Sequence, residues 1–222
     1  MIRIVLVDDQ ELFRAGVRVA LDAQVDMEVV GEASNGREGL RVIDEVRPDI
    51  VLLDMRMPVL DGVETVRSLF TGADPAALAA LPRVIVLTTF ALDAAAATAI
   101  RHGASGFLLK DATPAFLIAA IRAVDSGSSV LAPDELTQLF GADVTSAPAP
   151  PAPEAFRSLS VREKVIFGLL ARGLSNAEIA TQEFVTESTV KTHVSNILAK
   201  LSLRDRVQLV VYAHDNRLTA AR

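Results

Sequence analysis

The segment Ile2-Arg-Ile-Val-Leu-Val-Asp8-Asp9 opens the chain, and the same arrangement returns at Ile50-Val-Leu-Leu-Asp54. In both segments a short apolar run rich in β-branched residues ends directly on aspartate. Runs of this kind are typical of parallel strands that helices cover on both faces of the sheet. Because the carboxyl ends of parallel strands lie along one edge, the two segments predict an acidic site at that edge.

Outward from these two runs, three similar ones follow at residues 28–33, 84–87 and 106–109. Stretches with helical periodicity separate all five runs. This alternation predicts a doubly wound α/β fold of the flavodoxin type, with a five-stranded parallel sheet and five helices.

Helix starts support this segmentation. Asn35 and Asp61 are each followed three residues later by a glutamate, Glu38 and Glu64, which can close back onto the capping residue. Thr113-Pro114 places proline at a first helical position, where its missing N–H does no harm.

Composition divides the chain. Residues 141–153 hold four of the ten prolines and cannot pack a core, which predicts a semi-rigid spacer. We therefore expect one domain over residues 1–125, a linker over 126–154 that is Pro/Ala-rich from 141, and a second domain over 155–222. Up to residue 154 the net charge is −10, whereas the remainder carries +4, so only the second part suits a polyanion.

The second part predicts four short helices and no strand. Ser160-Val-Arg-Glu163 and Ser175-Asn-Ala-Glu178 are capping boxes, and Gly173 ends the first of the two helices that they begin. In that first helix an apolar stripe is expected from Val161, Val165, Ile166, Leu169 and Leu170. Short helices with such brief connections suit a helix-turn-helix.

Several classes of protein are excluded. With no cysteine, the chain has no disulfide, thiolate nucleophile or cysteine-bound metal. No uncharged stretch approaches the roughly 18 residues that a membrane helix needs, and no signal peptide is visible. We expect a cytoplasmic protein without a membrane partner.

Five polar residues follow the predicted strands: Asp8, Asp9, Asp54, Thr88 and Lys110. Three carboxylates in one cleft repel each other unless a cation neutralises them, and Mg²⁺ prefers such oxygen ligands together with a phosphate. Asp54 would then attack phosphorus and become an aspartyl phosphate, with Lys110 neutralising the phosphoryl oxygens and the Thr88 hydroxyl donating to one of them.

The residues from Val190 to Leu201 predict an amphipathic helix with Thr186 as its N-cap, which fits either a solvated surface helix or a helix that reads DNA. One side of the helical wheel is apolar, and the opposite side carries the small residues Thr192, Ser195, Asn196 and Ala199. Lys191, His193 and Lys200 flank this polar face. Such a face can approach base edges in the major groove while its cations meet phosphates.

The motifs of the first part closely resemble the receiver domain of bacterial two-component response regulators. They are Val7-Asp8-Asp9, Asp54-Met-Arg-Met-Pro58 with Asp61-Gly62, Thr88-Thr89, and Gly103-Ala-Ser-Gly-Phe-Leu-Leu-Lys110-Asp111. The resemblance implies that Asp54 is the phosphoacceptor. It also implies Mg²⁺ held by Asp8, Asp9, Asp54 and the backbone carbonyl of Arg56, with Thr88 and Lys110 reporting phosphorylation and Phe107 as the switch aromatic.

The second part resembles the LuxR-type helix-turn-helix in Leu159-Ser-Val-Arg-Glu163, Gly173-Leu-Ser-Asn-Ala-Glu-Ile-Ala180, Thr189-Val-Lys-Thr-His-Val194 and Arg204-Asp-Arg-Val-Gln208. The whole chain is thus similar to NarL/FixJ-type response regulators. The resemblance implies a sensor histidine kinase as phosphodonor and a dimer, formed on phosphorylation, that binds promoter DNA. It places Lys191, Thr192 and Ser195 nearest base edges, Thr189, His193, Asn196 and Lys200 nearer the DNA backbone, and Val207, Val210 and Val211 at the dimer contact.

The sequence departs from these relatives at residues 91–97 and at Glu183. Residues 91–97 are mostly alanine where bulky side chains are common, so the sequence does not indicate which face of the receiver forms a dimer. Glu183 replaces an apolar residue, so the helix before it is expected to end early or be strained. Arg56 and Phe90 are bulky and flank the expected path of a hydrolytic water, which predicts slow loss of the phosphoryl group.

Two other functions fit part of the pattern. An Mg²⁺-dependent phosphohydrolase also uses an acidic cluster with a lysine, but it leaves the DNA-reading helix unexplained. A constitutive DNA-binding regulator with an inactive receiver is the other alternative, and the complete set of five polar residues argues against it.

Overall fold

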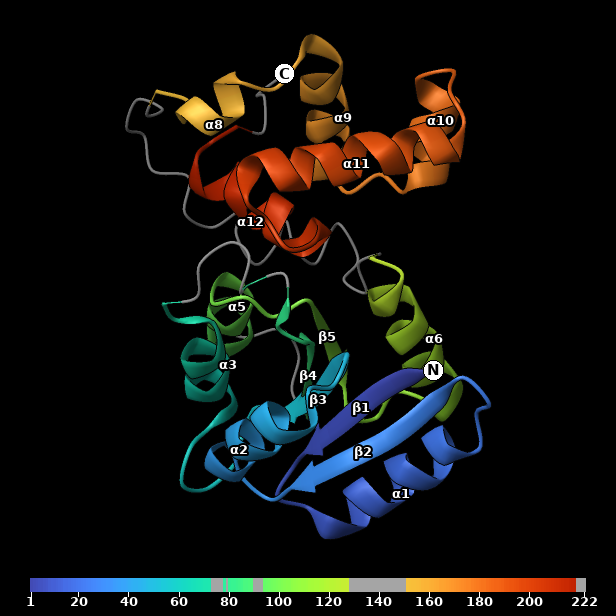
Figure 1. Ribbon diagram of the computed structural model, residues 1–222, viewed down its shortest axis with the longest axis vertical. Helices are drawn as coiled ribbons and strands as arrows, with labels where there is room; N and C mark the ends of the chain where they lie inside the picture. The colour runs from blue at the N-terminus through green and yellow to red at the C-terminus, as the bar shows by residue number, and fades with distance from the viewer. Residues whose placement is uncertain (73–77, 79, 90–93, 128–150, 219–222) are drawn as a thin grey trace. The chain divides into compact units, whose positions relative to one another are not determined.

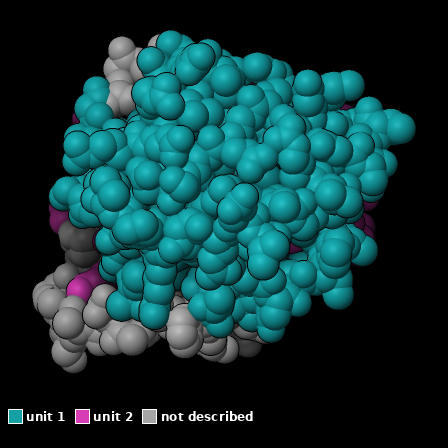
Figure 2. Space-filling model, turned by 90° about the horizontal axis from the view of Figure 1, so that it is seen from below, with its two compact units in different colours: residues 1–130 teal, residues 131–222 magenta. Residues whose placement is uncertain are grey.

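The computed structural model describes all residues except 73–77, 79, 90–93, 128–150 and 219–222. The chain divides into two compact units, unit 1 over residues 1–130 and unit 2 over residues 131–222 (Figure 2). Most of the expected linker lies outside the described residues, so its limits stay a prediction. Among the helices that are described, none is long and apolar enough to cross a membrane.

Unit 1 contains a five-stranded parallel sheet in the order β2-β1-β3-β4-β5. All five predicted runs are strands, with ends that differ by at most one residue. This topology confirms the doubly wound α/β fold. The strands are β1 (Ile2–Val7), β2 (Met27–Ala33), β3 (Ile50–Asp54), β4 (Arg83–Thr88) and β5 (Gly106–Leu109).

Helices cover both faces of this sheet (Figure 1). On one face lie α1 (Glu11–Asp22) and α6 (Pro114–Asp125), which share a hydrophobic core with alternate side chains of the strands. On the other face lie α2 (Gly36–Val46), α3 (Gly62–Phe70) and α5 (Ala94–Arg101). Burial on both faces explains why the strands read as nearly continuous apolar runs.

The expected N-caps of unit 1 are present. Each capping side chain accepts a hydrogen bond from the backbone N–H three residues further on, as seen at Asn35, Asp61 and Thr113. The two glutamates, however, have other partners. Glu38 accepts from the backbone N–H and the hydroxyl of Ser34, and Glu64 pairs with Arg67.

In unit 2 the structure describes five helices, one more than expected. They are α8 (Glu154–Arg157), α9 (Val161–Ala171), α10 (Asn176–Gln182), α11 (Glu187–Leu201) and α12 (Arg206–Asp215). The additional turn, α8, begins inside the expected linker. Phe156 holds it in place by packing edge-on against Phe167, with ring centroids 4.9 Å apart.

Both capping boxes of unit 2 are formed, but the apolar stripe expected on α9 is partly wrong. Val161 is 82% exposed and Val165 is 40% exposed. The side chains that α9 buries include Ile166, Phe167, Leu169 and Leu170, together with the charged Glu163.

Candidate functional site

The acidic residues of unit 1 meet where the strand order reverses, between β1 and β3. Asp8 follows β1 and Asp54 ends β3, and both are buried, whereas Asp9 is exposed. Carboxylate oxygens of these three residues lie within 4.8 Å of one another. Such a switch point is where open α/β sheets bind ligands.

Lys110, directly after β5, enters the same site. Its Nζ lies 2.7 Å from Asp8 Oδ2 and 3.0 Å from Asp54 Oδ2, and all three side chains are almost fully buried. The backbone N–H of Lys110 donates to the carbonyl of Thr88, a contact that joins the ends of β4 and β5. The site therefore combines three carboxylates with one ammonium group.

Burial governs the electrostatics of Asp54. Desolvation raises the pKa of this carboxyl above its ordinary value, and the charge of Asp8 acts in the same direction. Hydrogen bonds from Lys110 and from the backbone of Arg56 oppose the rise. Among the described residues, Asp8 Oδ2 accepts no well-directed hydrogen bond although it is buried. A buried, under-satisfied oxygen beside two further carboxylates fits a hard divalent cation such as Mg²⁺.

The structure describes three of the remaining predicted residues of unit 1: Thr88, Phe107 and Arg56. Thr88 ends β4 and is 8% exposed, and Phe107 is buried on β5, where its Cα pairs with that of Val86. The side chain of Arg56 is exposed. Phe90 lies outside the described residues, as do residues 91–93 of the alanine-rich stretch.

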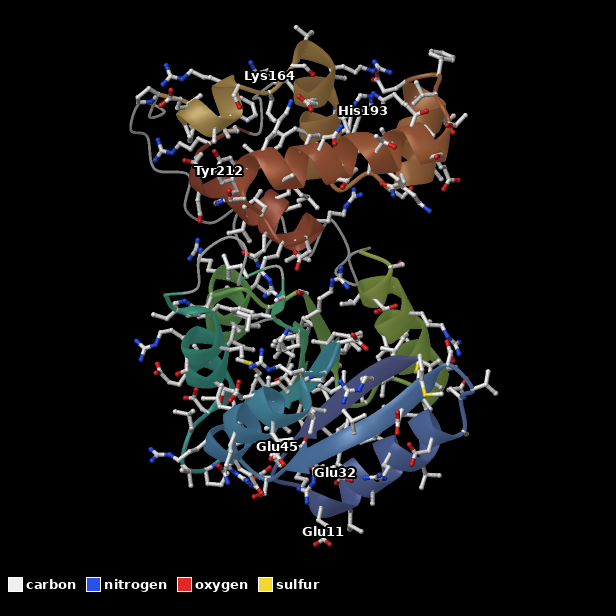
Figure 3. All side chains as sticks on the ribbon, in the orientation of Figure 1. Glu11, Glu32, Glu45, Lys164, His193 and Tyr212 are labelled. Atoms are coloured by element: carbon white, nitrogen blue, oxygen red, sulfur yellow. The ribbon has the colours of Figure 1, made fainter. Side chains whose placement is uncertain are left out.

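On α11 in unit 2 the predicted residues form a largely exposed polar face. Lys191, Thr192, Ser195 and Asn196 are exposed, whereas Thr189 and His193 are half-buried. Figure 3 labels His193 on this helix. Thr186 caps the helix by accepting from the backbone N–H of Thr189. Lys200 differs from the others because its ammonium group binds Glu163 of α9.

The α10–α11 turn accommodates Glu183 through a polar contact. α10 ends at Gln182, directly before Glu183, whose carboxylate accepts from Arg162 at 2.5 Å. Phe184, next in the chain, has a left-handed φ of 54° and is 96% exposed.

The last helix, α12, contributes Leu209 and Ala213 to the core of unit 2, with Tyr212 packed against it. Val207, Val210 and Val211 are also buried, yet the core cluster does not include them. Their part in a dimer stays a prediction.

Comparison with known proteins agrees with this architecture. Residues 4–122 match the response regulator receiver domain, and residues 157–213 match the bacterial regulatory proteins of the luxR family. The transcriptional regulatory protein LiaR of Bacillus subtilis is 40% identical over 222 residues, which cover 98% of this chain and 99% of LiaR. The chain belongs to the LuxR-type response regulators. It is therefore a two-component regulator of transcription, with a receiver domain and a DNA-binding domain.

Solved LuxR-type response regulators share this fold. One from Aurantimonas sp. SI85-9A1 is 32% identical, with a TM-score of 0.56 over 65% of this chain and 99% of that chain. The response regulator RcsB in complex with DNA is 20% identical and shares the fold, with a TM-score of 0.53 over 99% of both chains.

Three residues at the site of this response regulator were not singled out from the sequence. The Phe13 ring lies beneath the Lys110 ammonium, with 4.9 Å between Nζ and the ring centroid, and it lines a cavity of about 340 Å³ between α1 and α6. Arg14 donates to the carbonyl of Asp8 at 2.5 Å and to Glu32. Both residues lie on α1, and helical periodicity carried no signal for contacts with a strand end.

The third is Gly62, the second residue of the Asp61-Gly62 motif. Its N–H donates to the carbonyl of Met55, just after the acidic strand β3. A Cβ atom at this position would lie 2.5 Å from the Asp54 carbonyl oxygen and 2.8 Å from the Cα of Met55. Only glycine lets α3 begin this close to Asp54.

Proposed function

We propose that Asp54 accepts a phosphoryl group from a sensor histidine kinase, and that phosphorylation controls dimerisation and promoter binding. The observation that carries the proposal is the contact of one buried ammonium, Lys110 Nζ, with the carboxylates of both Asp8 and Asp54. In such a site a carboxylate nucleophile and a fixed cation face the same small volume. A structural ion pair alone does not require a third carboxylate, that of Asp9, at the same point.

Asp8, Asp9, Asp54 and the backbone carbonyl of Arg56 would hold Mg²⁺, which supplies positive charge to the phosphoryl oxygens. A carboxylate oxygen of Asp54 attacks phosphorus, so that a P–O bond forms while the P–N bond to the kinase histidine breaks. Lys110 neutralises the added negative charge from its position 3.0 Å from Asp54 Oδ2. The chain then carries the phosphoryl group without releasing product, which separates its role from that of a phosphohydrolase.

The response of the surface begins at Thr88. Thr88 moves toward the phosphorylated Asp54, and its hydroxyl donates to a phosphoryl oxygen. The Phe107 ring, which is 7% exposed in this structure, then turns into the space that Thr88 leaves. The bulky side chains of Arg56 and Phe90 slow hydrolysis of the aspartyl phosphate. Faster decay in the wild type than in an Arg56→Ala, Phe90→Ala variant would contradict this point.

Unit 2 is the proposed output. Lys191, Thr192 and Ser195 approach base edges, while Thr189, His193 and Asn196 lie nearer the DNA backbone, and Val207, Val210 and Val211 join two copies. The exposed polar face of α11 supports this assignment. The complex of RcsB with DNA, a protein of the same fold, supports it as well.

Labelling with a small phosphodonor tests the acceptor. With acetyl phosphate and Mg²⁺, the wild type is expected to gain one phosphoryl group, and Asp54→Asn none. Asp111→Asn is the matched control, because Asp111 is an exposed carboxylate next to Lys110 in the chain and lies outside the cluster. Undiminished labelling of Asp54→Asn would refute the assignment. Sustained turnover of a phosphomonoester would instead support the phosphohydrolase.

Binding to a duplex selected from a random pool by the wild-type protein tests the output. Lys191→Ala is expected to weaken this binding without unfolding unit 2. Lys164→Ala serves as the control, because Lys164 lies on α9 and donates to the carbonyl of Arg157 (Figure 3). Equal losses in the two variants would argue against α11 as the reading helix.

A further inference from the structure

Lys200, at the C-terminal end of α11, is held by another helix. Its Nζ donates to both carboxylate oxygens of Glu163, over 2.8 Å to Oε1 and 2.7 Å to Oε2. Glu163 lies in the first turn of α9 and is only 4% exposed. The same carboxylate accepts from the backbone N–H of Ser160 at 2.7 Å, which completes the capping box. Lys200 is therefore tied to a carboxylate that the fold itself holds in place.

This arrangement changes what the charge of Lys200 can do. A lysine that meets a DNA phosphate releases a counterion, whereas one already neutralised by a buried carboxylate releases none. Breaking such a pair would leave Glu163 charged and buried without its partner, which is strongly unfavourable. The low pKa of Glu163, about 2 and caused first by Lys200, agrees with a carboxylate that stays ionised.

We infer that Lys200 is a positioning residue, which fixes the last turn of α11 on α9 and makes no contact with a DNA phosphate. The inference rests on the proposed DNA binding of unit 2. It differs from the sequence-based prediction that Lys200 lies near the DNA backbone, and the experiment below decides between the two.

Neighbouring side chains show how the contact of Lys200 with α9 affects the orientation of α11. Ile197 and Leu201 are buried in the core of unit 2, so the apolar side of the last turns fixes the rotation of α11 about its axis. The ion pair adds a directional tether at the edge of that side. Ser195 lies five residues before Lys200, or about 7.5 Å along the axis, so a tilt of α11 at its end moves the base-reading side chains.

The test measures affinity for the selected duplex over a range of salt concentrations, with the full chain. Loss of one phosphate contact lowers the slope of log K against log salt by about one. Lys200→Met is expected to leave that slope at the wild-type value and to raise Kd about tenfold. Lys200→Arg should restore Kd to within about threefold, because guanidinium can bind both oxygens of a carboxylate.

Each other outcome overturns the inference. A slope that falls by about one in Lys200→Met would show a phosphate contact. An unchanged slope with an unchanged Kd would show that the pair supports folding alone. If Lys200→Met does not fold, Lys200→Gln still removes the charge, so its slope must equal the wild-type value; its amide can still donate to Glu163, so its Kd should lie between those of the wild type and a variant without that contact.

Failure of the proposed DNA binding is distinguishable from failure of this inference. It would appear as absent or salt-independent binding by the wild type itself. A double-mutant cycle with Glu163→Gln and Lys200→Met, measured on the thermal stability of unit 2, then still decides whether the two side chains are coupled. If the losses of thermal stability in the two single variants add up in the double variant, the two side chains are not coupled and the inference is wrong.

Discussion

Asp54 places a negative charge where burial disfavours it. Because its pKa is raised, the ionised carboxylate destabilises the metal-free fold at neutral pH, and this penalty disappears below the ordinary pKa of aspartate. We predict that Asp54→Asn raises Tm in EDTA at pH 7, because the neutral amide avoids the cost of burying a charged carboxylate. Calorimetry at pH 7 and at pH 3.5 checks that the Tm of Asp54→Asn exceeds that of the wild type at pH 7 and that this difference disappears in acid. A lower Tm than that of the wild type at pH 7 would contradict the argument.

Phe13 supports the ammonium group that Asp54 needs. Cation–π contacts contribute about 0.5–2 kcal/mol, so we predict that Phe13→Leu slows labelling by acetyl phosphate roughly 2- to 30-fold. Phe13→Tyr keeps an aromatic face under Lys110 and should label at nearly the wild-type rate. If the labelling rate depends on the size of the side chain at position 13 and not on its aromaticity, the ring has no electrostatic role.

The residues of the site differ in how well they can be predicted from the sequence. Asp8, Asp54 and Lys110 each follow a strand, so the topology of a parallel sheet is enough to bring them to one edge. Phe13 and Arg14 reach the same point from α1, and their contacts depend on the angle at which that helix packs. Periodicity gives the buried side of a helix but not that angle.

At the scale of elements, the start of α3 is fixed by backbone contact. We predict that Gly62→Ala abolishes labelling of Asp54 while leaving most of the fold intact, because the new methyl group must displace backbone atoms beside Asp54. Gly16→Ala is a matched control: a Cβ there meets nothing within 4 Å, and alanine favours a helix by roughly 0.5–1 kcal/mol. Normal labelling of Gly62→Ala would show that the loop adjusts.

The contact between α9 and α11 should depend on pH. Glu163 has a folded-state pKa of about 2, below its unfolded value, so its contribution to stability is complete above pH 5 and is lost as pH falls toward 2. The protection of the α9 and α11 amides against hydrogen exchange, relative to their intrinsic exchange rates at each pH, should therefore fall over this range. In Glu163→Gln this change should be absent, and an equal acid response in both proteins would assign it to other carboxylates.

Local signals and long-range contacts also explain where the element predictions succeeded. The capping boxes at Ser160 and Ser175 need only residues three apart, and both are formed. The stripe on α9 was wrong at Val161 and Val165 because a charged residue, Glu163, takes an inward position. Its partner, Lys200, is 37 residues away, and no local pattern pairs them.

For the whole molecule, the uneven charge and the proline-rich stretch were enough to indicate two parts, and the structure divides at residue 130. We predict that beryllofluoride with Mg²⁺, a mimic of the aspartyl phosphate, raises both the molecular mass in solution and the affinity for the selected duplex. Light scattering and titration measure the two effects, with Asp54→Asn as the control that should show neither. If the mimic binds and neither quantity changes, unit 1 does not control unit 2 through Asp54.

Tyr212 gives this chain an unusual optical property. It is the single tyrosine, the chain has no tryptophan, and its ring stands edge-on to Phe167 inside unit 2. Tyrosine fluorescence therefore originates in unit 2, and the proposed phosphorylation site in unit 1 contributes no tyrosine or tryptophan signal. The state of unit 2 can be followed without a label while unit 1 is titrated with metal or phosphodonor.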